Sequence, residues 1–110
     1  MKKFVLGKTK EAVLGMLPEN AIQMAKLGDN KICLVRIEEK VFAFEPFCPH
    51  RGAALRDGHI NGNLELVCPL HHYRFALQSG QLASGGSCRD LDIFPTKLTD
   101  SGLEIFIGEE

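Results

Sequence analysis

The sequence predicts an all-β domain of antiparallel strands. Short runs rich in β-forming residues outnumber helical patterns, and polar turns separate these runs at intervals of about 8 to 12 residues. Only residues 10–17 have a helical pattern, and we expect no more than a short turn there. The 110 residues contain no linker, repeat or low-complexity tract, so we expect one domain over residues 1–110.

The first half of the chain contains three strand candidates. Residues 21–27 form the first, which ends at a Gly-Asp-Asn turn at residues 28–30. Residues 31–37 and 41–44 are both rich in β-formers, and the polar turn between them predicts a hairpin.

The second half continues this pattern. Asn61-Gly62 lies between Ile60 and Leu64 and is a signal for a hairpin with a two-residue turn. A turn at residues 100–102 precedes residues 103–107, whose odd positions we expect to face the core.

Charge and hydropathy argue against a nucleic-acid partner and against a membrane association. Thirteen basic residues stand against fourteen acidic ones, and no basic run is longer than Lys2-Lys3, which is not the pattern of a nucleic-acid or membrane-surface protein. No apolar run approaches the roughly 18 to 20 residues that cross a bilayer, and the apolar stretch at residues 4–6 is soon interrupted by charges. We therefore expect a cytoplasmic protein without a membrane anchor.

Two short segments carry the strongest chemical signal. Cys48 and His50 form a C-x-H pair, and after seventeen residues Cys68 and His71 form a C-x2-H pair. Each segment offers one thiolate and one imidazole. This set suits a binuclear iron–sulfur centre with two cysteines on one iron and two histidines on the other.

The two segments resemble those of the Rieske [2Fe–2S] family. Residues 48–55 match the family pattern C-P-H-R-G-A-x-L, and residues 68–80 match C-P-x-H-x-x-x-F with a following Ser-Gly turn. Residues 91–98 look like the closing strand of the family, so the similarity covers nearly the whole chain. One position departs: the residue after the second histidine is usually Gly or another small residue, and here it is His72.

The resemblance implies a fold, a cofactor and a ligand set. The fold is three small antiparallel sheets with two cluster-binding loops at the tip. The cofactor is one [2Fe–2S] cluster per chain. Its inner ferric iron would be held by Cys48 and Cys68, and its outer, reducible iron by His50 and His71.

The resemblance also implies a one-electron carrier and not an enzyme. We expect a soluble ferredoxin that takes electrons from a flavin-dependent reductase and passes them to an oxygenase or another redox enzyme, and that is a monomer. Quinol-oxidising members of the family have a disulfide where this chain has Ala53 and Leu70. They also have hydroxyl donors where it has Phe75, which lacks a hydroxyl, and Tyr73, whose hydroxyl could point toward the cluster or away from it. Fewer donors predict a midpoint potential at the negative end of the Rieske range, on the order of −150 mV.

Two alternatives remain open at this point. The chain could be a small non-catalytic Rieske subunit of a larger, nitrite-reductase-like complex. Two cysteines and two histidines could also hold a structural zinc ion, although zinc fingers usually pair their ligands as C-x2-C and H-x3-H. We do not expect a complete oxygenase, because it would need a second iron site with two histidines and a carboxylate. Only His59 and His72 remain for such a site, and 110 residues leave no room for a catalytic domain.

The remaining cysteines and histidines receive no ligand role. Cys33 lies in an apolar alternating run and is expected to be a small core residue, whereas Cys88 follows a Gly-Gly-Ser loop and is left unassigned. His59 and His72 are expected to be strand or surface residues.

Overall fold

The computed structural model describes residues 2–108 and contains three small antiparallel sheets. The first has the strand order β1-β11-β10, the second β2-β3-β4-β9 and the third β5-β6-β7-β8. The elements in chain order are β1 (Lys2–Leu6), α1 (Lys10–Met16), β2 (Gln23–Leu27), β3 (Asn30–Ile37), β4 (Lys40–Phe44), η1 (Leu55–Asp57), β5 (His59–Ile60), β6 (Glu65–Val67), β7 (Arg74–Ala76), β8 (Leu82–Ser84), β9 (Ile93–Phe94), β10 (Thr96–Thr99) and β11 (Gly102–Ile107). The all-β fold with small antiparallel sheets is thus confirmed.

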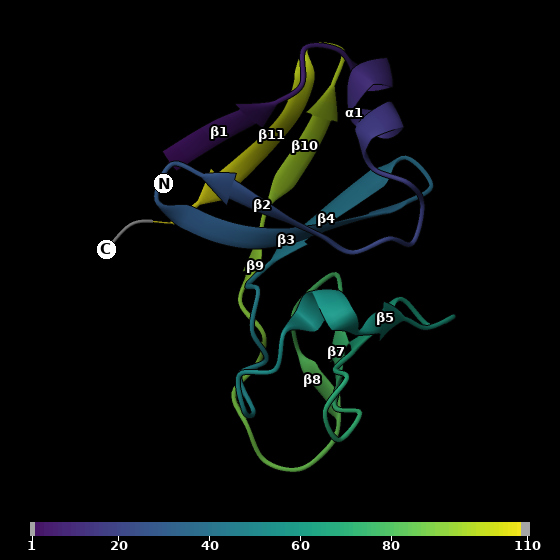
Figure 1. Cartoon of the computed structure of the whole chain (residues 1–110), viewed down its shortest axis with the longest axis vertical. Helices are drawn as coiled ribbons and strands as arrows, with labels where there is room; N and C mark the ends of the chain where they lie inside the picture. Colours follow the sequence, from purple (N-terminus) through teal and green to yellow (C-terminus); the bar gives the residue numbers. More distant parts are fainter. Residues whose placement is uncertain (1, 109–110) are drawn as a thin grey trace.

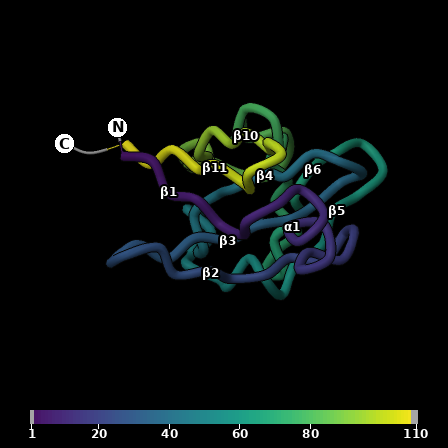
Figure 2. Tube along the Cα trace, turned by 90° about the horizontal axis from the view of Figure 1, so that it is seen from above, coloured from purple at the N-terminus to yellow at the C-terminus, as the bar shows by residue number. Residues whose placement is uncertain are grey.

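The sheets are distributed over two lobes (Figure 1). The upper lobe contains the first two sheets and α1, and the lower lobe contains the β5–β8 sheet, η1 and the long loops around them. Strands β1 and β11 pair along their whole length, so that Lys2 lies opposite Ile107. The first residues of β1 and the last residues of β11 consequently lie side by side (Figure 2), at the upper lobe and away from the loops of the lower one.

Strands β3 and β4 separate two hydrophobic cores. Ile32 and Leu34 on β3 pack into the upper core with α1 and β11, while Cys33 and Val35, which alternate with them, pack into the lower core. All four side chains are at most 2 % exposed. Because both faces of this sheet are covered, the strand is apolar at successive positions and not only at every second one. Cys33 is the buried core residue that the sequence predicts.

Most predicted elements are present, with local differences. The strands at 21–27, 31–37, 41–44 and 103–107 are confirmed, and Leu103, Ile105 and Ile107 are buried as expected. The helical segment is a complete seven-residue helix, which begins after Thr9, whose hydroxyl accepts a hydrogen bond from the Ala12 N–H at 3.0 Å. Residues 91–98 contain two strands, β9 and β10, on either side of Pro95.

Two features differ from the prediction more clearly. Strand β1 was not predicted, because its pattern is short and becomes a strand only through pairing with β11. The hairpin at Asn61-Gly62 exists, but its turn spans residues 61–64 and not two residues. The Asn61 side chain accepts hydrogen bonds from the N–H groups of Asn63 and Glu65, at 2.9 and 3.0 Å, which stabilises the longer turn.

No helix among residues 2–108 is long and apolar enough to span a bilayer.

Candidate metal centre

The four predicted ligands lie on two loops of the lower lobe. The first loop follows β4 and contains Cys48 and His50, and the second connects β6 with β7 and contains Cys68 and His71. Each loop is closed by backbone hydrogen bonds: the Cys48 N–H donates to the Ala53 carbonyl and the Cys68 N–H to the Tyr73 carbonyl, both at 2.8 Å. The first loop turns through Gly52, whose φ of 76° is a conformation that side chains with a Cβ rarely adopt.

The two cysteine side chains point into the lower core. Cys48 is 3 % exposed and Cys68 is 1 % exposed, and their sulfurs accept hydrogen bonds from the N–H groups of His50 and Leu70, each at 3.4 Å. Burial, together with the adjacent Cys48 thiol, raises the pKa of Cys68 to about 11. Two buried sulfurs side by side are poorly suited to a free thiolate and well suited to a bound metal, which would stabilise the deprotonated form.

The two histidines are also neighbours, nearer the surface. The ring centroids of His50 and His71 are 5.5 Å apart, with the rings inclined by 55°. The Nδ1 atom of His50 is buried and has no hydrogen-bond partner among residues 2–108. Burial, Arg51 and His71 lower the pKa of His50, which favours the neutral imidazole. A neutral ring with an unpartnered nitrogen fits a metal ligand, and buried nitrogens are rarely left unpaired otherwise.

The four side chains form two pairs and do not surround one point. Residues 2–108 contain no set of three or more His, Cys, Asp or Glu side chains gathered closely enough to hold a single ion. Two sulfurs lie inside and two imidazoles lie outside, which is the donor arrangement of a mixed-ligand binuclear cluster. The residues present therefore fit a [2Fe–2S] group, and the ligand set stays a prediction.

Comparison with known proteins identifies the family. A model of the Rieske [2Fe–2S] domain matches residues 7–95. The chain belongs to the Rieske [2Fe–2S] domain family. It is 30 % identical over 87 residues to the ferredoxin component of the naphthalene 1,2-dioxygenase/salicylate 5-hydroxylase systems of Ralstonia sp, a match that covers 79 % of this chain and 83 % of that protein.

Solved structures show the same fold. The ferredoxin of carbazole 1,9a-dioxygenase from Nocardioides aromaticivorans IC177 has a TM-score of 0.83 at 18 % identity, over 98 % of this chain and all of that one. A chain in the complex of reduced oxygenase and oxidized ferredoxin in carbazole 1,9a-dioxygenase has a TM-score of 0.74 at 19 % identity, over 93 % of this chain and 99 % of that one. These likenesses establish the Rieske architecture that the motif predicts.

The other two histidines lie apart from the paired ligands. His59 is exposed on β5, and His72 is exposed beside His71. His71 and His72 both have left-handed backbone conformations, with φ of 63° and 58°. Glycine adopts the second value without strain and a residue with a Cβ does not, which is a physical reason for the glycine of the family pattern at this position.

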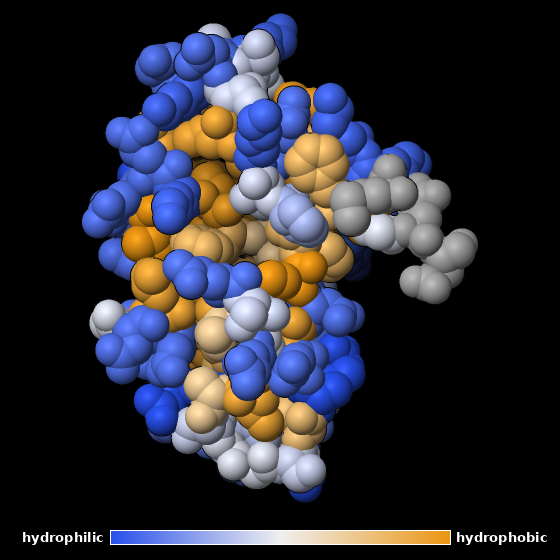
Figure 3. All heavy atoms as spheres, turned by 180° about the vertical axis from the view of Figure 1, so that it is seen from behind, coloured by the Kyte–Doolittle hydropathy of each residue, from blue (hydrophilic) through white to orange (hydrophobic). Residues whose placement is uncertain are grey.

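Two hollows lie beside the hairpin of β3 and β4, away from the predicted ligands. Their volumes are about 410 and 430 Å³, and both are lined by residues 39, 40, 42 and 78 among others. Neither lining includes a His or Cys of residues 2–108. Seen from behind, apolar side chains show through in patches among polar ones in both lobes (Figure 3).

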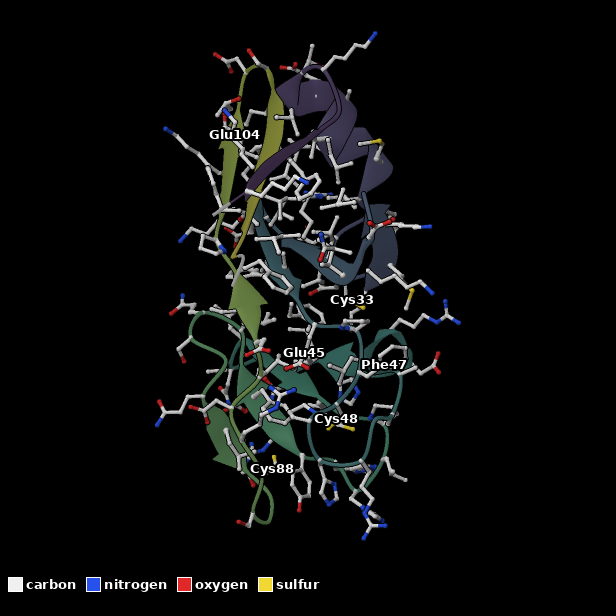
Figure 4. All side chains as sticks on the ribbon, turned by 90° about the vertical axis from the view of Figure 1, so that its left-hand side faces the viewer. Cys33, Glu45, Phe47, Cys48, Cys88 and Glu104 are labelled. Carbon is white, nitrogen blue, oxygen red and sulfur yellow. The ribbon has the colours of Figure 1, made fainter. Side chains whose placement is uncertain are left out.

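A third loop, which the sequence did not reveal as part of the site, packs against the two ligand loops. It follows β8 and carries Cys88, which is half-buried and packs on the lower core with Cys48 and Tyr73. Figure 4 shows Cys48 and Cys88 together in the lower lobe, with Cys33 higher, where the two cores meet.

An ion pair fastens this third loop to the start of the first. The two terminal guanidinium nitrogens of Arg89, Nη1 and Nη2, donate to the Glu45 carboxylate at 2.8 Å, and the Asp92 N–H donates to the same carboxylate at 2.7 Å. The hydrogen bond to Glu45 raises the pKa of Arg89 further. Glu45 is the residue directly after β4, so its carboxylate connects the third loop to the scaffold of the Cys48 loop.

We expect Glu45→Ala to loosen the third loop and to lower the free energy of unfolding by about 1–2 kcal/mol, because a bidentate pair and a backbone donor lose their acceptor. Chemical denaturation measures the loss, and amide exchange should rise over residues 85–92. Lys3→Ala breaks the longer pair between Lys3 and Glu104, at 3.6 Å, in which the carboxylate is more exposed than that of Glu45. This variant should change stability by no more than about 0.5 kcal/mol. Equal effects of the two variants would show that the Glu45 pair has no special role.

Proposed function

We propose that this Rieske domain is a one-electron carrier with one [2Fe–2S] cluster, held by Cys48 and Cys68 at the inner iron and by His50 and His71 at the outer iron. The single observation that carries this assignment is the pairing of two buried sulfurs with two imidazoles, one of which has an unpartnered, buried Nδ1. When bound, the cluster supplies a site that accepts and releases one electron. The protein supplies the ligands, the dry surroundings and the exit path.

Charge explains why this mixed ligand set suits a carrier. Two ferric ions, two sulfides, two thiolates and two neutral imidazoles sum to zero, and one-electron reduction leaves a charge of −1. A cluster with four thiolates would go from −2 to −3. Because an electron is added more easily to a neutral centre, replacing two cysteines by two histidines raises the potential, from about −400 mV to a range of about −150 to +300 mV.

The acceptor that we infer is a terminal oxygenase, and the donor a flavin-dependent reductase. The relatives named above are ferredoxins of dioxygenase systems, one of them in a complex with its oxygenase. On this chain His71 and its neighbours Pro69 and Leu70 are exposed, as is Phe47 on the other loop (Figure 4). An imidazole edge next to the exposed apolar side chains of Pro69 and Leu70 suits transient docking, with the partner shielding the transfer from water.

We further propose a monomer in the cytoplasm. All four cysteines are free thiols in the structure, and their roles as predicted ligands, core residue and half-buried loop residue need no disulfide. This use of cysteine is typical of a reducing compartment.

The test of the proposed function is the metal content and spectrum of the purified protein. We expect a reddish-brown protein with about two irons and two acid-labile sulfides per chain. On reduction it should give a rhombic EPR signal whose average g value is below that of all-cysteine clusters. A colourless protein with one tightly bound zinc would reject the proposal and establish the structural zinc site instead.

A further inference from the structure

One aromatic contact links the two ligand loops in a way that the proposed function does not use. The ring of Tyr73, at the end of the second loop, stacks on the imidazole of His50 in the first, with centroids 4.0 Å apart and planes inclined by only 9°. The other aromatic contact of His50 within residues 2–108 is the tilted one with His71. Tyr73 therefore covers one face of His50 in a nearly parallel arrangement.

The opposite side of Tyr73 rests on two glycines of the third loop. A Cβ on Gly85 would lie 2.6 Å from the Tyr73 Cγ, and a Cβ on Gly86 would overlap the phenol oxygen. Gly85 also has a φ of 139°, which residues with side chains rarely adopt. The phenol thus lies between His50 and a glycine pair, and a side chain on either glycine would collide with it.

An ion pair fixes the position of the loop that carries the two glycines. The third loop carries the two glycines and also Arg89, which follows Gly85 by four residues. The ion pair between Arg89 and Glu45 holds this loop against the first one. Elements on both sides of the phenol are therefore fixed, and a stacked aromatic ring between them restricts the rotation of the imidazole that it touches. His71, in contrast, is exposed to solvent.

We propose that Tyr73 is the positioning residue for His50: clamped between this imidazole and the Gly85-Gly86 backbone, it fixes the ring orientation and shields one of its faces from water. The proposal rests on His50 being a ligand of the outer iron. Preorganised ligands bind a metal centre more tightly and fix its electronic structure, because their orientation sets the overlap with the metal. Tyr73 acts through His50 and touches no reacting atom itself.

The first test compares the loaded wild-type protein with Tyr73→Leu and Tyr73→Phe. The readouts are the two histidine-nitrogen hyperfine couplings of the reduced cluster and the rate of cluster loss to an iron chelator. We expect Tyr73→Leu to change one of the two couplings. It should also speed cluster loss about threefold to tenfold, which is the effect expected from losing one aromatic stacking contact. Tyr73→Phe, which keeps the ring, should stay within about twofold of wild type and keep both couplings.

The second test moves the phenol without changing it. Gly86→Ala should displace Tyr73 and reproduce the altered coupling, since Gly86 has no left-handed backbone to strain. Gly62→Ala is the matched control, because a Cβ there meets nothing within 4 Å. Adding Tyr73→Phe to Gly86→Ala removes the overlap with the oxygen and should restore most of the wild-type coupling.

The outcomes separate the two proposals. A wild-type protein without iron rejects the proposed function. A normal wild-type cluster whose couplings are the same in Tyr73→Leu and Gly86→Ala rejects the positioning role alone, even if both variants lose the cluster faster, because that would be general destabilisation. If Tyr73→Leu does not fold, the comparison of Gly86→Ala with Gly62→Ala gives the decision.

Discussion

Replacement of either predicted histidine ligand should remove the cluster from this Rieske domain. We expect His50→Ala and His71→Ala to fall from about two irons per chain to nearly none, or to retain a centre of altered type. The physical reason is that the two imidazoles are the only protein donors to the outer iron in the proposed ligand set, and alanine offers no donor atom. Iron and sulfide analysis with the visible spectrum measures the loss.

The chain provides its own controls for this experiment. His59 is exposed on β5, and His72 is exposed next to His71, so His59→Ala and His72→Ala should both keep their iron. His72→Ala is the sharper control because it lies beside the proposed ligand. Loss of iron in His72→Ala combined with retention in His71→Ala would show that the other member of the pair is the ligand.

The positions of the ligand loops could be predicted because strong local signals border them. The β-rich runs end at Phe44 and Val67, and each is followed by a Cys-Pro pair that cannot continue a central strand. Cys33 was equally predictable, since a small thiol in an apolar run belongs in a core. By contrast, β1 gains its strand character from pairing with β11, and no local pattern reports a partner so far along the chain.

The contacts of the third loop could not be predicted for a different reason. Its sequence is rich in glycine and serine and has no hydrophobic periodicity, so it reads as an ordinary surface turn. Its role depends on where the folded scaffold places it, with Arg89 against Glu45 and the glycines against Tyr73. The sequence marks Tyr73 as a possible hydroxyl donor to the cluster, and no local pattern indicates that its ring stacks on His50.

The tuning of the cluster leads to the second large effect that we expect, a midpoint potential on the order of −150 mV at neutral pH. Hydrogen bonds to the sulfurs raise the potential because they stabilise the added negative charge. The sulfurs of Cys48 and Cys68 accept hydrogen bonds from the backbone N–H groups of His50 and Leu70. Within residues 2–108 they accept none from a Ser, Thr or Tyr hydroxyl. The Tyr73 hydroxyl lies beside Gly86, and Phe75 has none. Potentiometry measures the value.

A substitution at Phe75 tests the cause of this low potential and not only its value. Phe75 is fully buried in the lower core together with the two proposed cysteine ligands, Cys48 and Cys68. It stands at the position where quinol-oxidising Rieske proteins have a tyrosine. Phe75→Tyr should raise the potential by about 40 mV, which corresponds to about 1 kcal/mol for one hydrogen bond and one electron. Tyr73→Phe should leave it nearly unchanged, because that hydroxyl is already turned toward the third loop. A wild-type potential above roughly +100 mV would show that the two backbone donors, or polar groups of the bound state, outweigh the missing hydroxyls.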